Sequence, residues 1–543
     1  MKKIFYFVAA SLLMTSCLED RAIEAYNEDF KSVFGDTDPL HTWKMVENQS
    51  VEVSLDKPSH VKIYVKAGNA YRLAADYENV SGTRTLSYDA PVGCEDIHVT
   101  VDGVPYQRGN SRAESVVSGI EITNNYTYFT YQQINDFHDD GHTLPETDDN
   151  TGKLTGMDYK FISNGDAYNF YPIYWGGIFY HSYGLFYYDA DGIKHEVDFI
   201  ENHKAEGLIQ RITEVGTDNW TDVTNDYAYE HFFPRDNSQS KPDYTGVTKP
   251  VLRSRCFTIQ LPAGTRFGFY VDITQKSTTE PGKVIDRGRF YSDPELNKTN
   301  AFSAFGYLQR NDATNNKTYN YITVEDYNDN DYNDFIFVLE GTPSPIDETP
   351  IKYIYAVEDL GGENDFDFND IVFSVSHIQG HEDAIVQPLA AGGIYEAVIR
   401  FNGNSCGEIH GKFGKPSSEM VNTAKGTTKN TMVKANPFKV NVGTEWSHAA
   451  YGNSGNGFSV EVNIPNRVDK KITTYVPGED NAPQMLVLSE NWLWPTERTR
   501  ISDAYSEFLE WGANYSLTNW DGYYDANKTW VSKHTDGKVV NWK

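Results

Sequence analysis

The stretch YITVEDYNDNDYNDFIFVLEG (Tyr321–Gly341) places a cluster of acids directly before a run of large apolar residues. An unbroken β-strand would put Asp331 and Asn333 on the same face as Phe335 and Phe337, because strand side chains alternate with a period of two. Burying the two polar side chains on the same face as the two aromatic rings would be unfavourable. We therefore expect the backbone to turn at Asn333, whose side chain tolerates left-handed conformations, and a buried strand to follow.

The composition of the 543-residue chain favours strands over helices. Aromatic residues make up 14 % of it, with 37 Tyr and 10 Trp, and runs of Ala, Leu and Met are scarce. A chain of this length exceeds one ordinary core, so about three or four domains are expected. The formal net charge of −30 argues against nucleic-acid binding. The expected fold class is mostly β, with tandem β-sandwich domains of jelly-roll or immunoglobulin-like type.

Polar and proline-rich stretches mark the expected domain boundaries. The expected order is a signal peptide over 1–17, a tether over 18–34, an N-terminal β-sandwich over 35–134, an acidic linker over 135–153, a second β-sandwich over 154–341, a Pro-rich linker over 342–350 and a C-terminal β domain over 351–543. One amphipathic helix is predicted within PTERTRISDAYSEFLEWG (Pro495–Gly512), where Ile501, Tyr505, Phe508 and Leu509 form an apolar stripe.

The acidic pattern of the opening stretch recurs in VEDLGGENDFDFNDIVFSVS (Val357–Ser376), with DFND at 367–370 matching DYND at 331–334. Carboxylate and amide oxygens that converge in a turn are the ligands Ca²⁺ prefers, and a cation would neutralise the crowded charges. We therefore expect two structural Ca²⁺ sites. The candidate ligands are Glu325, Asp326, Asp329, Asp331, Asn333 and Asp334 in the first turn, and Glu358, Asp359, Asp365, Asp367, Asn369 and Asp370 in the second.

Neither turn is an EF-hand. Asp329, Asp331 and Asn333 supply a D-x-D-x-N start, but Asp334 stands where that loop needs glycine, and a strand follows where a helix is required. An alternative interpretation needs no metal, because Asp and Asn side chains also accept hydrogen bonds from their own backbone as Asx turns.

The first seventeen residues, MKKIFYFVAASLLMTSC, combine two lysines, an apolar run and a small-residue approach to Cys17. The apolar run is too short to span a bilayer. Cys17 resembles the lipidated cysteine of bacterial lipoproteins, and the acids of the following LEDR resemble a surface-export signal. We expect a lipid on Cys17, an outer-membrane location and display at the cell surface. The alternative is a signal peptide cleaved elsewhere.

Two further resemblances cover the rest of the chain. RFYSDPELN (289–297) with the opening stretch is similar to the family called domain of unknown function 4114, over about Tyr171–Gly341; Tyr327 and a shorter spacer depart from its E-D-L pattern. From Ile351 onward, VEDLGGENDFDFNDIVF, GEIHGKFG (407–414) and WPTERTRISDAYSEFLEW (494–511) resemble the C-terminal region of LruC-domain lipoproteins. These resemblances imply an exported β-rich protein that depends on calcium, with no reaction attached.

The expected role is structural or adhesive, and two other functions stay open. The aromatic stretch NFYPIYWGGIFYHSYGLFYYD (169–189) offers Tyr174 and Trp175 as contacts for a surface glycan, as in a polysaccharide uptake system, although alternating aromatics usually form a core. A glycoside hydrolase is the remote alternative, since no acid pair stands out. GNSCG (403–407) matches the G-x-S-x-G pattern, but the residues that follow it indicate a strand and a loop rather than the nucleophile elbow that the pattern requires.

The other three cysteines have neither the spacing of a metal site nor that of a disulfide framework. Their pairing is left open: Cys94, Cys256 and Cys406.

Overall fold

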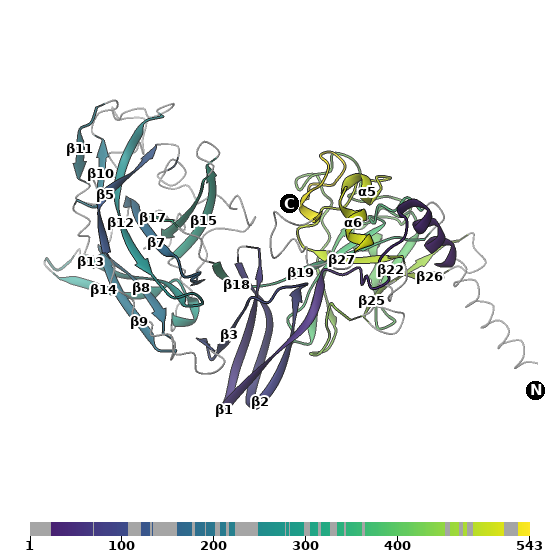
Figure 1. The fold of residues 1–543 in the computed structure, drawn as a ribbon, viewed down its shortest axis with the longest axis horizontal. Helices are drawn as coiled ribbons and strands as arrows, with labels where there is room; N and C mark the ends of the chain where they lie inside the picture. The colour runs from purple at the N-terminus through teal and green to yellow at the C-terminus, as the bar shows by residue number, and fades with distance from the viewer. Residues whose placement is uncertain are drawn as a thin grey trace, which may run out of the picture. The chain divides into compact units, whose positions relative to one another are not determined.

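The computed structural model divides the chain into two compact units (Figure 1). The first unit comprises Met1–Asp102 and Glu348–Lys543, and the second comprises Gly103–Asp347. The residues that the structure describes are 23–68, 70–106, 121–130, 133, 160–175, 180–189, 192–200, 207–212, 217–222, 248–276, 279–281, 283–297, 305–312, 317–325, 334–340, 344–360, 364–450, 457–465, 471–474, 482–514 and 530–542. Among them, no helix has the length and apolar character needed to cross a membrane.

The second unit is a β-sandwich built from antiparallel pairs. One sheet contains β6 (Lys160–Ile162), β8 (Tyr180–Tyr188), β9 (Lys194–Ile200), β13 (Arg266–Lys276) and β14 (Val284–Tyr291). The other runs in the order β11 (Trp220–Asp222), β10 (Ile209–Ile212), β12 (Pro250–Gln260), β7 (Ala167–Trp175), β17 (Phe335–Glu340), β16 (Lys317–Val324) and β15 (Phe305–Asp312), with β5 (Glu121–Thr130) paired to β12. Strand β18 (Ser344–Pro350) pairs with β6, and β4 (Val104–Pro105) and the short 3₁₀ helix η2 (Pro294–Leu296) complete the unit.

Aromatic rings from the two sheets meet in the core of this sandwich. Phe269 of β13 lies 5.5 Å from Phe170 of β7 and 5.1 Å from Phe337 of β17, and Tyr183 of β8 stacks on Phe335 at 4.0 Å. Phe335 and Phe337 are both buried, as the period-two argument from the sequence expects of the strand after the acidic turn. Most of the aromatic stretch predicted over 169–189 is core as well, including Phe170, Tyr171, Tyr183, Phe186, Tyr187 and Tyr188.

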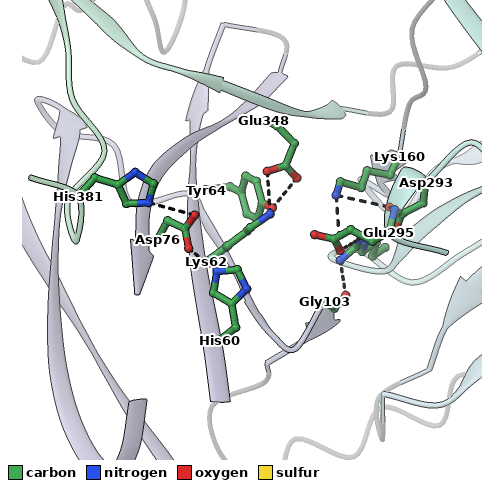
Figure 2. A network of polar contacts seen from close by, with 11 residues as sticks. His60, Lys62, Tyr64, Asp76, Gly103, Lys160, Asp293, Glu295, Glu348 and His381 are labelled. Atoms are coloured by element: carbon green, nitrogen blue, oxygen red, sulfur yellow. Dashed lines mark hydrogen bonds and ion pairs between the residues drawn. The ribbon is translucent and has the colours of Figure 1, made fainter. Parts of the chain in front are cut away.

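A buried ion network connects β6, β13 and the 3₁₀ helix η2 of this unit (Figure 2). Arg266 donates to Gly103 O at 2.5 Å, to Asp293 and to Glu295, while the Lys160 Nζ lies 3.5 Å from Asp293 Oδ1. Lys160, Arg266 and Asp293 are almost completely buried. Two cations thus face two carboxylates, which satisfies the requirement that buried charge be paired.

The first unit contains a second sandwich in its C-terminal part. One sheet runs in the order β24 (Phe438–Asn441), β21 (Asp383–Ala390), β20 (Ile371–Ser376), β19 (Lys352–Val357) and β27 (Met485–Ser489); the other runs β23 (Asn404–Glu408), β22 (Glu396–Phe401), β25 (Phe458–Asn463) and β26 (Lys471–Thr474). Phe458 of β25 lies 5.6 Å from Tyr355 and 5.9 Å from Phe373 across the core. The short helices are α4 (Ile409–Lys412), α5 (Ile501–Ala504), α6 (Phe508–Ala513) and the 3₁₀ helix η4 (Trp530–Ser532).

The N-terminal residues join this same unit, although the sequence assigned them to a separate sandwich. Strands β1 (Val46–Ala67), β2 (Ala70–Pro91) and β3 (Ile97–Val101) form an antiparallel ribbon. Backbone bonds tie it to the loop after β20, with Asp76 N to Gln379 O at 2.9 Å. Asp76 also contacts both His60 and His381 there (Figure 2).

Residues 23–34, expected as part of a tether, form a helix. Tyr26 and Phe30 are buried, and the Tyr26 hydroxyl donates to Pro483 O at 2.6 Å. Tyr26, Phe30 and Phe34 recur every four residues, which places them on one face of the helix. This helix therefore packs into the first unit through an aromatic stripe.

The expected amphipathic helix near the C-terminus is divided into α5 and α6. Between them Tyr505 adopts an extended backbone, and its hydroxyl donates to Leu493 O at 2.6 Å and accepts from Leu493 N at 3.1 Å. Ile501, Tyr505 and Phe508 are buried as expected, whereas Leu509 is exposed. Because a buried hydroxyl group needs hydrogen-bond partners, these two bonds hold Tyr505 in the extended conformation that separates α5 from α6.

Candidate metal centre

Both acidic stretches connect neighbouring antiparallel strands. In the second stretch Val357 of β19 pairs with Ile371 of β20, and Glu358 is the first residue of the connecting loop. In the first stretch Val324 of β16 pairs with Phe335 of β17, so Glu325 takes the equivalent place. Glu358 is 2 % exposed and Glu325 is completely buried. The sequence repeat is therefore also a structural repeat, a hairpin whose loop begins with a buried glutamate.

The backbone of the second loop takes left-handed conformations at three large residues. Leu360, Phe366 and Phe368 have φ values of 55°, 54° and 53°. Such values are rare for residues other than glycine and cost on the order of 1–3 kcal/mol each. Phe366 is held by rings at 5.5, 5.5 and 5.2 Å, those of Tyr26, Phe30 and Phe34. The aromatic packing of the N-terminal helix thus offsets the strain of this turn.

These turns bring three carboxylates together. One oxygen from each of Glu358, Asp365 and Asp367 lies within 4.8 Å of the others. Asp365 is partly exposed, whereas Glu358 and Asp367 are buried. Glu358 Oε1 accepts from Phe368 N at 2.5 Å, and the two oxygens of Asp367 accept from Asn369 N at 3.1 Å and Arg498 N at 2.8 Å. Backbone donors therefore fix the orientation of both buried carboxylates.

The carboxyl groups raise one another's pKa. Burial raises the pKa of Glu358 well above its usual value, and Asp367 and Asp365 raise it further. Burial likewise raises the pKa of Asp367, with Asp365 as the next contribution. The pKa of Asp370 is raised by desolvation and then by Asp359 and Glu358. The charged forms are unfavourable together, so protons or a bound cation would stabilise the cluster.

A second layer of close contacts surrounds the cluster. Asp359 N donates to Asp370 Oδ2 at 2.8 Å, and Asn369 Nδ2 donates to Pro495 O at 3.0 Å. Among the described residues, the buried Asn369 Oδ1 has no hydrogen-bond partner. A Cβ at Gly392 would overlap this oxygen, and one at Gly393 would lie 2.8 Å from Asp359 Oδ2. Both positions therefore require glycine for the adjacent chain to approach the acidic loop.

Solvent reaches the cluster through a pocket of about 300 Å³ at Asp365. Its lining residues are Asn364, Asp365, Arg498, Arg500 and Asp503. Glu497, on the same segment as Arg498, has its pKa raised by burial and then by Asp365. The segment 495–503 thus contributes backbone and side chains to the site, which the sequence did not indicate because it was interpreted only as a helix.

The donor set of the second loop fits a hard cation. The three clustered groups are all carboxylates, and oxygen ligands favour Ca²⁺ or Mg²⁺ over metals that prefer sulfur or imidazole. The Asn369–Asp367 bond is an Asx turn, so the metal-free interpretation from the sequence is also represented in the geometry. A carboxylate oxygen has two lone pairs, so one backbone bond to each leaves room for a cation.

The predicted residues are described to different extents. In the second turn Glu358, Asp365 and Asp367 are brought together, and Asp359 and Asp370 share a hydrogen bond. In the first turn Glu325 is buried and Asp334 N donates to Val324 O at 3.0 Å. The other predicted residues lie outside the described part of the chain or have side chains outside it: Cys17, Asp326, Asp329, Asp331, Asn333, Tyr174 and Trp175. Cys94, Cys256 and Cys406 form no disulfide.

Two family models match parts of the chain, and neither spans half of it. The model described as domain of unknown function DUF4114 matches residues 261–342, and that described as domain of unknown function DUF4842 matches residues 459–523. No curated protein and no solved structure matches the chain. The first match includes the first Asp-rich turn and confirms the expected resemblance there, and the second covers β25 to α6. The chain thus contains two regions similar to domains of unknown function, with the Glu358–Asp370 loop between them.

Proposed function

We propose that the loop Glu358–Asp370 binds Ca²⁺ and that the ion acts as a structural element of the first unit. The observation that carries this proposal is the convergence of Glu358, Asp365 and Asp367 within 4.8 Å, two of them buried. Ca²⁺ takes six to eight oxygen ligands at about 2.3–2.6 Å, which carboxylates of this loop, backbone carbonyls and water together supply. The same role is proposed for the equivalent loop that begins at Glu325.

The position of Asp365 supports a bound ion over protons alone. Asp365 converges on the buried Glu358 and Asp367, with one oxygen of each group within 4.8 Å of the others. A buried set of protonated carboxyls would not need Asp365 to turn toward the pair. A bound cation would make the convergence of the three carboxylates stabilising, because it would attract all three.

The protein is proposed to be a lipid-anchored, non-enzymatic protein of the outer membrane, displayed at the cell surface through Cys17. The signal-peptide pattern and the resemblance to LruC-domain lipoproteins support this location. Calcium would fix the loops of each sandwich outside the cell, where the ion is abundant, in a structural or adhesive role. A surface glycan or a surface protein is the proposed partner.

Calorimetric titration with Ca²⁺, with thermal melts in calcium and in chelator, tests the metal site. The chain after Cys17 is compared with Asp367→Asn, with Glu325→Gln for the other loop, and with Asp56→Asn as a matched control on an exposed residue. At a Ca²⁺ concentration of 100 times Kd, binding stabilises the folded state by about 2.7 kcal/mol. We expect a raised melting temperature that Asp367→Asn reduces and Asp56→Asn leaves unchanged. If the titration shows no heat of binding and the melting temperatures in calcium and in chelator are identical, both loops are metal-free Asx turns.

A separate experiment tests the anchor. Cells grown with a radiolabelled fatty acid should label the wild-type protein and not Cys17→Ala, and protease added to intact cells should degrade the wild type. Equal labelling of the two proteins would contradict lipidation at Cys17.

A further inference from the structure

Two neighbouring strands of the second unit, β12 and β5, place arginine and tyrosine side chains on one outward face. In β12 the residues Leu252 and Ser254 are buried, so Arg253 and Arg255 between and after them point away from the core. On β5, Tyr128 lies opposite Arg253 and Tyr126 opposite Arg255. The outward face of this part of the sheet therefore alternates arginine with tyrosine.

These side chains form a stacked ladder. The Arg253 guanidinium lies 4.3 Å from the Tyr126 ring centroid and 4.8 Å from that of Trp220 on β11. Arg255 lies 5.0 Å from the Tyr126 centroid, and Tyr128 packs edge-on against Trp220 at 5.7 Å. Stacking of this kind fixes long arginine side chains in place before any ligand arrives.

Among the residues that the structure describes, no carboxylate pairs with either arginine. In the part of the chain that the structure describes, neither Arg253 nor Arg255 forms an ion pair, whereas Arg289 of the same unit pairs with both Asp272 and Glu196. Arg253 Nε donates to Gln210 Oε1 at 2.6 Å, and Arg255 Nε is buried without a hydrogen-bond partner. Guanidinium groups without a carboxylate partner in the described part of the chain can bind an external anion such as a carboxylate or sulfate.

The aromatic members give the face a second binding property. Tyr128 is 50 % exposed and Trp220 is partly exposed, so part of each ring is open to solvent. Exposed Tyr and Trp rings combine an apolar face with a polar edge and provide stacking surfaces for the apolar faces of sugar rings. Anion-binding guanidinium groups beside stacking rings match an acidic sugar best.

We propose that the face formed by Tyr126, Tyr128, Trp220, Arg253 and Arg255 binds an acidic polysaccharide. The guanidinium groups contact its carboxylate or sulfate groups, and Tyr128 and Trp220 stack on its sugar rings. This site is separate from the acidic loops and does not depend on bound calcium.

Binding of the full chain to polygalacturonate, dextran sulfate and neutral dextran tests this proposal. The measurement is affinity electrophoresis in the presence of chelator, which prevents calcium from gelling the polyuronate. We expect retardation by one or both acidic polymers and none by dextran. Retardation by polygalacturonate alone identifies a carboxylate sugar, and retardation by dextran sulfate alone identifies a sulfated one.

Variants separate this site from general electrostatics. Arg253→Gln combined with Arg255→Gln should weaken binding at least tenfold, and Tyr128→Ala, at a half-exposed position that does not disturb the core, should weaken it several-fold. Arg289→Gln removes one equal charge from a paired arginine and should bind as the wild type does. The proposal is overturned if the wild type binds neither acidic polymer, if the double variant and Tyr128→Ala bind unchanged, or if polyglutamate binds as strongly as the acidic sugars.

Discussion

In the absence of calcium, the stability of the first unit should fall as pH rises from 5 to 8. The pKa values of Glu358 and Asp367 are raised by burial and by neighbouring carboxylates. A carboxyl whose folded-state pKa lies above its unfolded value retains its proton on folding. Its contribution to stability is therefore complete below the unfolded value of about 4 and is lost as pH rises through the folded value.

The magnitude follows from the number of protons retained. Each proton that the folded state holds and the unfolded state lacks lowers the free energy of unfolding by about 1.4 kcal/mol per pH unit. Glu358 and Asp367 are 2 % and 1 % exposed, so solvent does little to screen this effect. Over the pH range in which the folded pair keeps one proton that the unfolded chain has lost, the stability therefore falls by about 1.4 kcal/mol for each pH unit. Excess calcium, which replaces the proton, should remove this slope.

Urea unfolding monitored by tryptophan fluorescence is the assay, at several pH values with chelator and with calcium. Eight of the ten tryptophans belong to the first unit, so the signal reports mainly on it. Asp367→Asn should flatten the pH dependence in chelator, because asparagine stays neutral throughout. The reasoning is refuted if wild-type stability in chelator is flat or increases across this range, as it does for carboxylates held by salt bridges.

Three further changes test other parts of the account. Gly392→Ala should lower the free energy of unfolding by about 1–3 kcal/mol and weaken calcium binding, since its Cβ would overlap Asn369 Oδ1; unchanged calorimetric affinity and stability would contradict this close approach. Asp293→Asn should destabilise the second unit by about 3–5 kcal/mol in differential scanning calorimetry, because it leaves the buried Lys160 and Arg266 facing Glu295 alone; an unchanged transition would show that the network contributes little. Phe366→Ala should cost about 3–5 kcal/mol by removing a ring packed on the N-terminal helix, and a loss below 1 kcal/mol would mean that the helix does not support the turn.

The buried strands after the acidic residues followed from local pattern. Alternation with a period of two indicated such a strand, and β17 and β20 begin at Phe335 and Ile371, whereas the turn predicted at Asn333 lies outside the described residues. Such features depend on residues close in sequence, whose spacing alone decides which face they occupy. The resemblance at residues 261–342 rested on the same local motif.

The convergence of particular acids could not be predicted in this way. Asp365 and Asp367 meet Glu358 because Phe366 and Phe368 take left-handed conformations, which sequence statistics disfavour for large residues. Packing of residues 23–34 supports that conformation, and this contact joins segments more than 300 residues apart. A stripe of aromatic residues at spacing four, Tyr26, Phe30 and Phe34, was the available signal for the helix.

The arginine ladder depends on register between distant strands. Arg253 meets Tyr126 and Trp220 only because β12 lies between β5 and β10, with β11 beyond β10. No local pattern in the sequence specifies these pairings.

The most direct test of the calcium proposal is the anomalous diffraction of a crystal grown with CaCl₂. An anomalous peak about 2.3–2.6 Å from oxygens of Glu358, Asp365 and Asp367 is the predicted result. A map without a peak there, with the oxygens of the three carboxyl groups still within 4.8 Å of one another, would show that protons and not calcium neutralise the cluster.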